Sequence, residues 1–223
     1  MNTKLFFNAI IKYLLGVLIV GLLLFLPAGS FYYYNGWLFM GLLFIPMFVF
    51  GIILMIKNPK LLKRRLDARE KESDQKNVIK LSAIMFILGF IFAGLNYRFS
   101  FIILPPIVTY IASILFIISY IMYAVVLKEN EYLSRTIKVE KDQKVIDTGL
   151  YKTVRHPMYS ITILLFLSIP LILGSIISFV IFLIYPFIIN IRINNEEKVL
   201  EKELIGYKEY KRKVKYKLIP FVF

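Results

Sequence analysis

The stretch Phe31–Ile56, FYYYNGWLFMGLLFIPMFVFGIILMI, contains no charged side chain. About 20 consecutive apolar residues are enough for a helix to cross the hydrocarbon core of a bilayer. In lipid every backbone N–H and C=O must find its partner inside the segment, which favours a helix over an open strand. Three tyrosines at positions 32–34 and Trp37 open the stretch, as is typical of the aromatic belt at a membrane interface. The stretch is therefore predicted to be a membrane-spanning helix.

Similar apolar runs recur along the whole chain, which is 59% hydrophobic and has a mean hydropathy of +0.71. Such a composition is too apolar for an ordinary soluble domain. The runs are Leu5–Ala28, Phe31–Ile56, Leu81–Tyr97, Phe99–Leu127 and Met158–Ile191. The last run is too long for one ordinary span, and Pro170, Gly174 and Ser175 interrupt it. We expect two short helices joined by a turn there, either as two crossings or as a re-entrant hairpin.

All but one of the basic residues lie on one side of this predicted topology. Of the 28 Lys and Arg, only Arg98 lies in the three expected turns, 27–36, 96–105 and 170–175. The other 27, together with all 14 acidic residues, lie in the N-terminal stretch, the two hydrophilic segments and the C-terminal tail. By the positive-inside rule this side is cytoplasmic, and an even number of crossings places both termini there.

We therefore predict an all-α, multi-pass membrane helix bundle that forms a single domain over residues 1–223. Four spanning helices occupy residues 1–127, and residues 128–223 add a short helical hairpin and a cytoplasmic C-terminal helix. Anionic lipid headgroups are the expected partners of the net charge of +14, so nucleic acid is not expected as a partner. The chain has no cysteine and His156 is its sole histidine, so no metal site is expected.

The sequence GLYKTVRHPMY, residues 149–159, gathers ionisable and aromatic side chains at the start of the last apolar run. Pro157 suits the first turn of a helix, which places Arg155 and His156 at the positive N-terminal end. Such an end attracts a carboxylate or a phosphate, and Tyr159 offers a ring and a hydroxyl one turn further in. The same residues also fit an ordinary interfacial anchor that contacts lipid headgroups.

The sequence NNEEKVL, residues 194–200, places two carboxylates just beyond an apolar helix, where the other membrane ends are basic. Glu196, Leu200 and Glu203 share one helical face by their spacing. Carboxylates at this point suit a cationic ligand such as the sulfonium of S-adenosylmethionine. The other interpretation is a solvated helix whose carboxylates pair with neighbouring lysines.

Taken together and in this order, these sequences resemble the motifs of the isoprenylcysteine carboxyl methyltransferase family, which is related to the phospholipid methyltransferases. The family pattern has Gly-x-Tyr, Arg-His-Pro-x-Tyr, an apolar hairpin, Glu-Glu-x-x-Leu, a Gly with spaced tyrosines, and a basic stretch before a final Pro. The matching residues here are Gly149–Tyr151, Arg155–Tyr159, Glu196–Leu200, Gly206–Tyr210 and Lys213–Pro220. The basic segment 58–66 is also similar to a loop of the bacterial members, so the expected location is a prokaryotic cell membrane.

The resemblance implies a methyltransferase that uses S-adenosylmethionine and a lipophilic acceptor, which enters through a tunnel from the bilayer. The cofactor is implied to lie between the hairpin and the C-terminal tail. The implied catalytic residues are Arg155, Glu196 and Glu197; the implied cofactor-binding residues are His156, Tyr159, Tyr151, Glu196, Tyr207 and Tyr210; and the implied acceptor-binding residues are Arg212 and Lys213. Lys213 departs from the arginine usual at its position, and lysine does not reproduce bidentate hydrogen bonding.

Two other functions fit the sequence: a sterol-reductase-like membrane enzyme that binds NADPH, and a non-enzymatic membrane subunit. The 11 glycines include no G-x-G pair, so the dinucleotide fingerprint of soluble methyltransferases is absent. The acceptor stays open among a carboxylate, an amine and another lipid group. A carboxylate needs no base, whereas an amine would need one, which Glu196 or Glu197 could supply.

Overall fold

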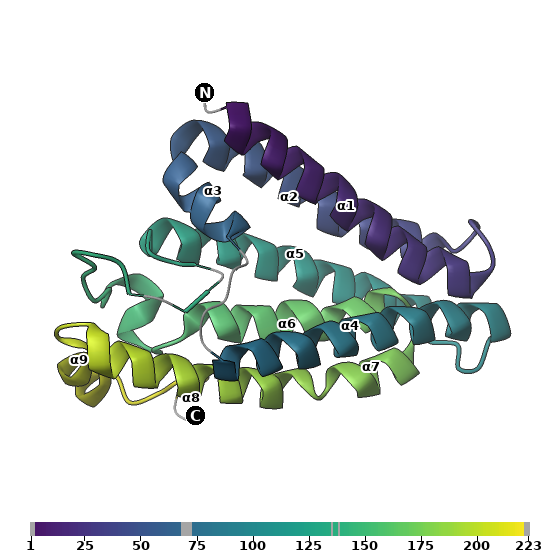
Figure 1. Ribbon diagram of the computed structural model, residues 1–223. Coiled ribbons are helices and arrows are strands. Elements are labelled where there is room, and N and C mark those ends of the chain that lie inside the picture. Colours follow the sequence, from purple (N-terminus) through teal and green to yellow (C-terminus); the bar gives the residue numbers. More distant parts are fainter. Residues whose placement is uncertain (1–2, 68–72, 135, 138, 221–223) are drawn as a thin grey trace.

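The computed structural model describes residues 3–67, 73–134, 136–137 and 139–220. Within these residues the regular structure is helical, and the one β-type contact is an isolated bridge between Val154 and Tyr216. Figure 1 shows the long helices running side by side. The prediction of an all-α bundle is confirmed.

Five helical stretches in the described part of the chain are long and apolar enough to cross a membrane. The first four belong to α1 (Thr3–Ala28), α2 (Tyr34–Lys57), α4 (Ser73–Phe99) and α5 (Pro106–Glu129). The fifth, Ile176–Glu203, combines α7 (Ile176–Phe182) and α8 (Tyr185–Glu203) and packs beside the shorter apolar helix α6 (Pro157–Ile172). These two arms form the predicted hairpin, and its second arm is longer than expected. The short helices are α3 (Pro59–Leu66), η1 (Gly149–Lys152) and α9 (Tyr207–Lys213).

Two long helices differ in their bounds from the apolar runs that predicted them. Helix α5 begins at Pro106, after the extended backbone of Pro105, in agreement with the turn expected over residues 96–105. The third long helix begins at Ser73 and not at Leu81, so polar residues extend it. Burial explains part of this extension, because Gln75 is fully buried and its Nε2 donates to a backbone carbonyl of α8 at 3.4 Å.

The long helices expose apolar side chains on their outer surface and pack aromatic rings inside. On α1, Leu18 and Leu26 are 56% and 70% exposed. Inside the bundle, the ring of Phe39 lies 5.7 Å from that of Phe90 and 6.1 Å from that of Phe116, which joins α2, α4 and α5. An apolar surface of this extent is suited to lipid, so the chain is an integral membrane protein.

Three turns meet at one end of the bundle, which we call the turn end. Tyr33 OH donates to Leu173 O at 2.6 Å, and Asn96 Nδ2 donates to Gly174 O at 3.2 Å. Gly174 has a φ of +71°, a conformation that favours glycine, and the hairpin turns there as predicted. The opposite end, which we call the charged end, carries α3, α9 and the segment that follows α5 (Figure 1). The hairpin therefore extends over the whole length of the bundle.

Candidate functional site

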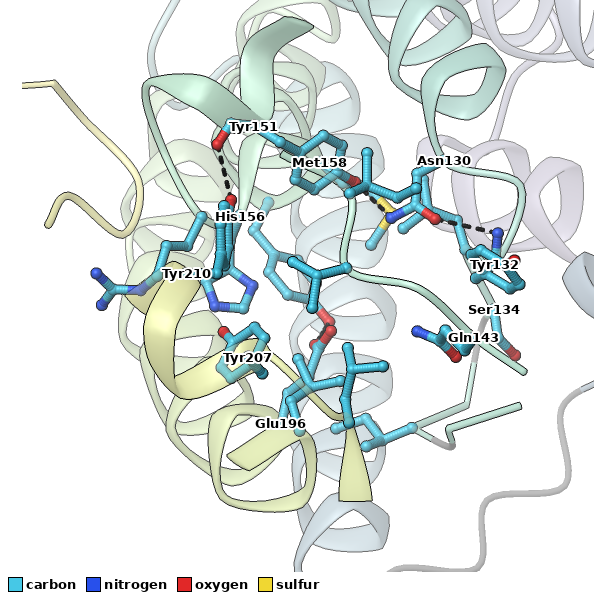
Figure 2. Close-up of a pocket in the computed structure, with 18 of the residues that line it drawn as sticks. Asn130, Tyr132, Ser134, Gln143, Tyr151, His156, Met158, Glu196, Tyr207 and Tyr210 are labelled. Atoms are coloured by element: carbon cyan, nitrogen blue, oxygen red, sulfur yellow. Dashed lines mark hydrogen bonds between the residues drawn. The ribbon is translucent and has the colours of Figure 1, made fainter. Parts of the chain in front are cut away.

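A cleft opens at the charged end, between the segment 130–146 and the helices that follow it (Figure 2). Its empty volume is about 830 Å³, part of which is open to solvent. The other walls come from η1, the N-terminus of α6, the C-terminal half of α8, and α9. Its polar and ionisable lining comprises Asn130, Tyr132, Ser134, Thr136, Gln143, Lys144, Tyr151, Arg155, His156, Tyr159, Arg192, Glu196, Tyr207 and Tyr210.

The Arg155-His156-Pro157 sequence starts α6 as predicted, with Pro157 in the first turn and His156 as the N-cap residue. The backbone N–H of Arg155 donates to Tyr216 O, and that of His156 donates to Lys217 O, both at 2.9 Å. These bonds hold the basic C-terminal stretch alongside the motif. Two sequence signals that lie far apart in the chain thus form one structural unit.

The guanidinium of Arg155 is directed at the same C-terminal stretch. Its Nη1 donates to Val214 O and to Lys215 O, each at 2.7 Å, and its Nε donates to Glu197 Oε1 at 2.8 Å. The charge of Arg155 is therefore balanced within the protein. Its main effect on the cleft is to hold the start of α6 in place.

Glu197 joins three helices through one buried carboxylate, which is 5% exposed. Besides Arg155, its oxygens lie 3.1 Å from His156 Nε2 and 2.9 Å from Lys211 Nζ. Hydrogen bonds to Glu197 and then to Glu201 raise the pKa of Lys211 above its ordinary value. A buried carboxylate requires such partners. Glu197 thus connects α6, α8 and α9, and it does not line the cleft.

Glu196 is the only carboxylate that lines the cleft among the described residues. Tyr159 OH donates to Glu196 Oε2 at 2.5 Å, and Arg192 Nε donates to Tyr159 OH at 2.8 Å. The ring of His156 stacks near that of Tyr159, with centroids 5.8 Å apart. Neighbouring residues on a helix point about 100° apart. Glu196 therefore faces the cleft, whereas Glu197 faces the ion pairs behind it.

Three tyrosines close the cleft on the side of η1 and α9. Tyr210 OH donates to Tyr151 O at 2.8 Å, and Asn130 Nδ2 donates to Tyr151 OH at 3.1 Å. The buried hydroxyl of Tyr207 has no hydrogen-bond partner among the described residues. Burial and then nearby carboxylates raise the pKa of Tyr207, so the hydroxyl stays protonated. A buried donor of this kind marks a place where a ligand can provide the acceptor.

Gly149 sets the turn that leads into the motif. Its φ is +50°, and a Cβ there would collide with the carboxylate of Glu129. Oε2 of the same carboxylate accepts a hydrogen bond from the backbone N–H of Leu150 at 3.2 Å. Glycine thus lets Glu129 hold η1 and direct Tyr151 toward the cleft.

The structure brings the two motifs together, although His156 and Glu197 are 41 residues apart in the chain. Glu197 lies behind the cleft wall. Arg212 and Lys213 lie outside the cleft and are exposed, and Lys213 Nζ pairs with Asp147 Oδ2 at 3.6 Å. The predicted residues that line the cleft are Tyr151, Arg155, His156, Tyr159, Glu196, Tyr207 and Tyr210.

Sequence reasoning missed the wall formed by the segment 130–146. The described residues of this wall form no regular helix or strand and belong to none of the recognised motifs, so no periodicity in the sequence indicates them. Arg192 was missed as well, although its spacing of four residues from Glu196 predicts a shared helical face. The missed polar residues of the segment are Asn130, Tyr132, Ser134, Thr136, Gln143 and Lys144.

The model of the isoprenylcysteine carboxyl methyltransferase (ICMT) family matches residues 111–202. This region runs from α5 to the end of α8 and contains both motifs. Over this region, the chain is similar to the ICMT family. The match confirms the resemblance for the motifs at 149–159 and 196–200, and it supports a membrane methyltransferase. No curated protein sequence matches the chain significantly.

The region that matches the ICMT family does not include every part of the cleft. Tyr207 and Tyr210 of α9 follow it in the chain, and α1 to α4 precede it. The cleft is thus completed by residues that follow the matched region.

Proposed function

We propose that this protein transfers a methyl group from S-adenosylmethionine to a lipophilic acceptor that enters from the bilayer. The observation that carries the proposal is the meeting of both family motifs at one cleft. His156 and Glu196 line the cleft, and the Glu197 carboxylate ties the two motifs together. A headgroup anchor or a solvated helix face would leave these side chains in water, whereas His156 is only 6% exposed.

The residues of the cleft fit S-adenosylmethionine. The sulfonium and ammonium groups of the cofactor are cations, and Glu196 provides a carboxylate for them. The free donor of Tyr207 suits a carboxylate or ribose oxygen of the cofactor, and the rings of Tyr151 and Tyr159 suit contact with adenine. The cofactor supplies a methyl group that is already activated. The chain therefore has to bind, align and exclude water more than it has to provide acid or base.

Some side chains around the cleft position the helices, and others contact the ligand. Arg155 and Glu197 fix the start of α6 against α8 and α9. Tyr159, which is held by Arg192, donates to Glu196 and keeps that carboxylate directed into the cleft. A carboxylate acceptor requires no base. An amine acceptor would have to lose a proton, and Glu196 is the cleft carboxylate that could take it.

We further propose that the charged end faces the cytoplasm, because 27 of the 28 basic residues are expected there. Both hairpin arms then cross the membrane, since the hairpin turn contacts Tyr33 at the turn end. Lys60 of α3 is exposed and suits an anionic headgroup. Reporter fusions at Phe223 and within residues 60–75 should both report the cytoplasm. An external signal at Phe223 would contradict this orientation.

The function is tested with purified protein, lipid extracts and S-adenosylmethionine that carries a labelled methyl group. We expect a labelled lipid in the mass spectrum. Glu196→Gln should weaken binding of S-adenosylhomocysteine about ten- to a hundredfold, because a charge-assisted hydrogen bond contributes about 1.5–3 kcal/mol. Glu203→Gln changes an exposed carboxylate of the same helix and should bind normally. Binding of NADPH instead would support a reductase, and binding of neither ligand would support a non-enzymatic subunit.

A further inference from the structure

Helix α3 lies against the protein with one face and exposes basic residues on the other. The Asn58 side chain accepts a hydrogen bond from the backbone N–H of Leu61 at 3.0 Å, and Pro59 occupies the first turn, so the helix starts directly after α2. Leu61 and Leu62 are buried, whereas Lys63 is exposed. Arg65 follows Leu61 by four residues and therefore lies on the inner face.

The guanidinium of Arg65 contacts two residues that line the cleft. Its Nη1 lies 3.3 Å from Ser134 O and 3.9 Å from Met158 Sδ, and both residues line the cleft. Its Nη2 is hydrogen-bonded to Tyr123 OH, and the guanidinium lies over the Tyr123 ring at 5.5 Å from the centroid. No carboxylate of the described residues forms an ion pair with Arg65. Its donors are thus directed at the cleft wall and not at an acidic partner.

Arg64 holds the same wall at two other points. Its Nη1 donates to Glu131 O at 2.5 Å, and its Nη2 pairs with Glu140 Oε2 at 3.2 Å. Its guanidinium also lies 5.7 Å from the ring centroid of Tyr132, which lines the cleft. The two arginines therefore contact the wall on both sides of Ser134. The side chain of Arg64 is 19% exposed, so water competes with these contacts only in part.

We propose that Arg64 and Arg65 are positioning residues for the ligand cleft. The described wall residues between α5 and η1 form no regular helix or strand, so contacts with the rest of the protein must hold their conformation. Without the arginines the wall would have to be ordered when the ligand binds, and that cost would weaken affinity. Helix α3 lies outside the region that matches the family, so this contribution comes from the N-terminal part of the chain.

We call the contacts of Arg64 and Arg65 with the cleft wall the clamp. The choice of ligand in the test rests on the proposed function, but the proposal that the clamp orders the wall does not. Arg65→Gln should weaken S-adenosylhomocysteine binding about tenfold in calorimetry, as expected for the loss of hydrogen bonds to a charged group. It should raise KM for S-adenosylmethionine more than it lowers kcat. Arg65→Lys should bind more tightly than Arg65→Gln but more weakly than the wild type. Lysine keeps the positive charge but lacks the planar guanidinium with its several N–H donors. Lys63→Gln, an exposed change on the same helix, should bind like the wild type.

Hydrogen exchange of the ligand-free protein tests the clamp independently. In Arg65→Gln the backbone amides of residues 131–134 should exchange at least tenfold faster than in the wild type, while those of α5 stay unchanged. If the wild type bound no S-adenosylhomocysteine, the proposed function would be wrong. The exchange rates would still show whether the arginines hold the wall in place. If Arg65→Gln does not fold, Arg64→Gln carries the same expectation. Unchanged exchange together with unchanged affinity in a folded variant would overturn the proposal.

Discussion

The two ends of the helix bundle both carry a cavity with polar lining, but they use their polar groups in different ways. At the turn end, a cavity with an empty volume of about 720 Å³ is lined by Tyr33, Asn96 and Gly174 among others. The side chains of Tyr33 and Asn96 bond to backbone groups and hold the turns together. At the charged end, Tyr207 lines the cleft, and its buried hydroxyl has no hydrogen-bond partner among the described residues.

This difference separates polar groups that hold the fold from polar groups that are available to a ligand. Groups of the first kind should contribute to stability and not to ligand binding. Polar groups that are available to a ligand should contribute to ligand binding and not to stability. The ion pairs of Arg155 and Glu197 combine the two roles, because they hold together the elements that form the cleft.

The largest effect is expected where both roles coincide. Arg155→Gln removes a cation from the buried Glu197 carboxylate and should lower the free energy of unfolding by about 3–5 kcal/mol. Ligand binding should be lost with it, because α6 would no longer be fixed against the C-terminal stretch. Unfolding in detergent by titration with sodium dodecyl sulfate measures the first effect, and calorimetry measures the second. Arg212→Gln is the matched control, because Arg212 is exposed and lies outside the cleft, and it should change neither.

A smaller effect, on stability alone, is expected at the turn end. Asn96→Ala removes hydrogen bonds to the backbone of Ile102 and Gly174 and leaves those groups unpaired. The free energy of unfolding should fall by about 1–3 kcal/mol. The dissociation constant of S-adenosylhomocysteine should stay unchanged in the folded protein. A clear loss of affinity would mean that the two ends are coupled. The polar groups of the turn end would then not contribute to stability alone.

The smallest effects come from removing a single hydroxyl at each end. Tyr33→Phe loses the bond to Leu173 O and should cost about 1 kcal/mol of stability without changing ligand affinity. Tyr207→Phe loses no bond within the described protein, so its stability should be unchanged, while affinity for S-adenosylhomocysteine falls about tenfold. Thermal melting and calorimetry of the two variants should thus give opposite patterns. A stability loss without an affinity loss in Tyr207→Phe would assign its hydroxyl to the fold.

The sequence is informative for features that depend on residues close together in the chain. Long uncharged runs such as Phe31–Ile56 predicted the spans, and Pro157 predicted the start of α6. The sequence could not distinguish Glu196 from Glu197, because packing of α8 against α6 and α9 decides which neighbour faces the cleft. Nor could it place Lys213, whose side chain points away from the cleft on a short helix.

Other parts of the site were unpredictable for the same reason. Helix α3 has only 8 residues, too few for a reliable helical period. The contacts of Arg64 and Arg65 join residues more than 50 positions apart in the chain. Such contacts follow from the tertiary arrangement, which local patterns do not specify. The family motifs indicate the site residues at the start of α6 and at the end of α8, but they indicate none in the wall between α5 and η1.

His156 is the most direct probe of the proposed binding of S-adenosylmethionine between the two motifs at the charged end of the bundle. It is the sole histidine of the chain, so labelling with ¹⁵N-histidine gives ring signals without background in NMR spectra of the detergent-solubilised protein. The ring of His156 lines the cleft and bonds to Glu197. Titration with S-adenosylhomocysteine should shift its ring signals in a saturable manner, whereas NADPH should leave them in place. Ring signals that stay unchanged up to millimolar S-adenosylhomocysteine would contradict binding of the cofactor at this cleft.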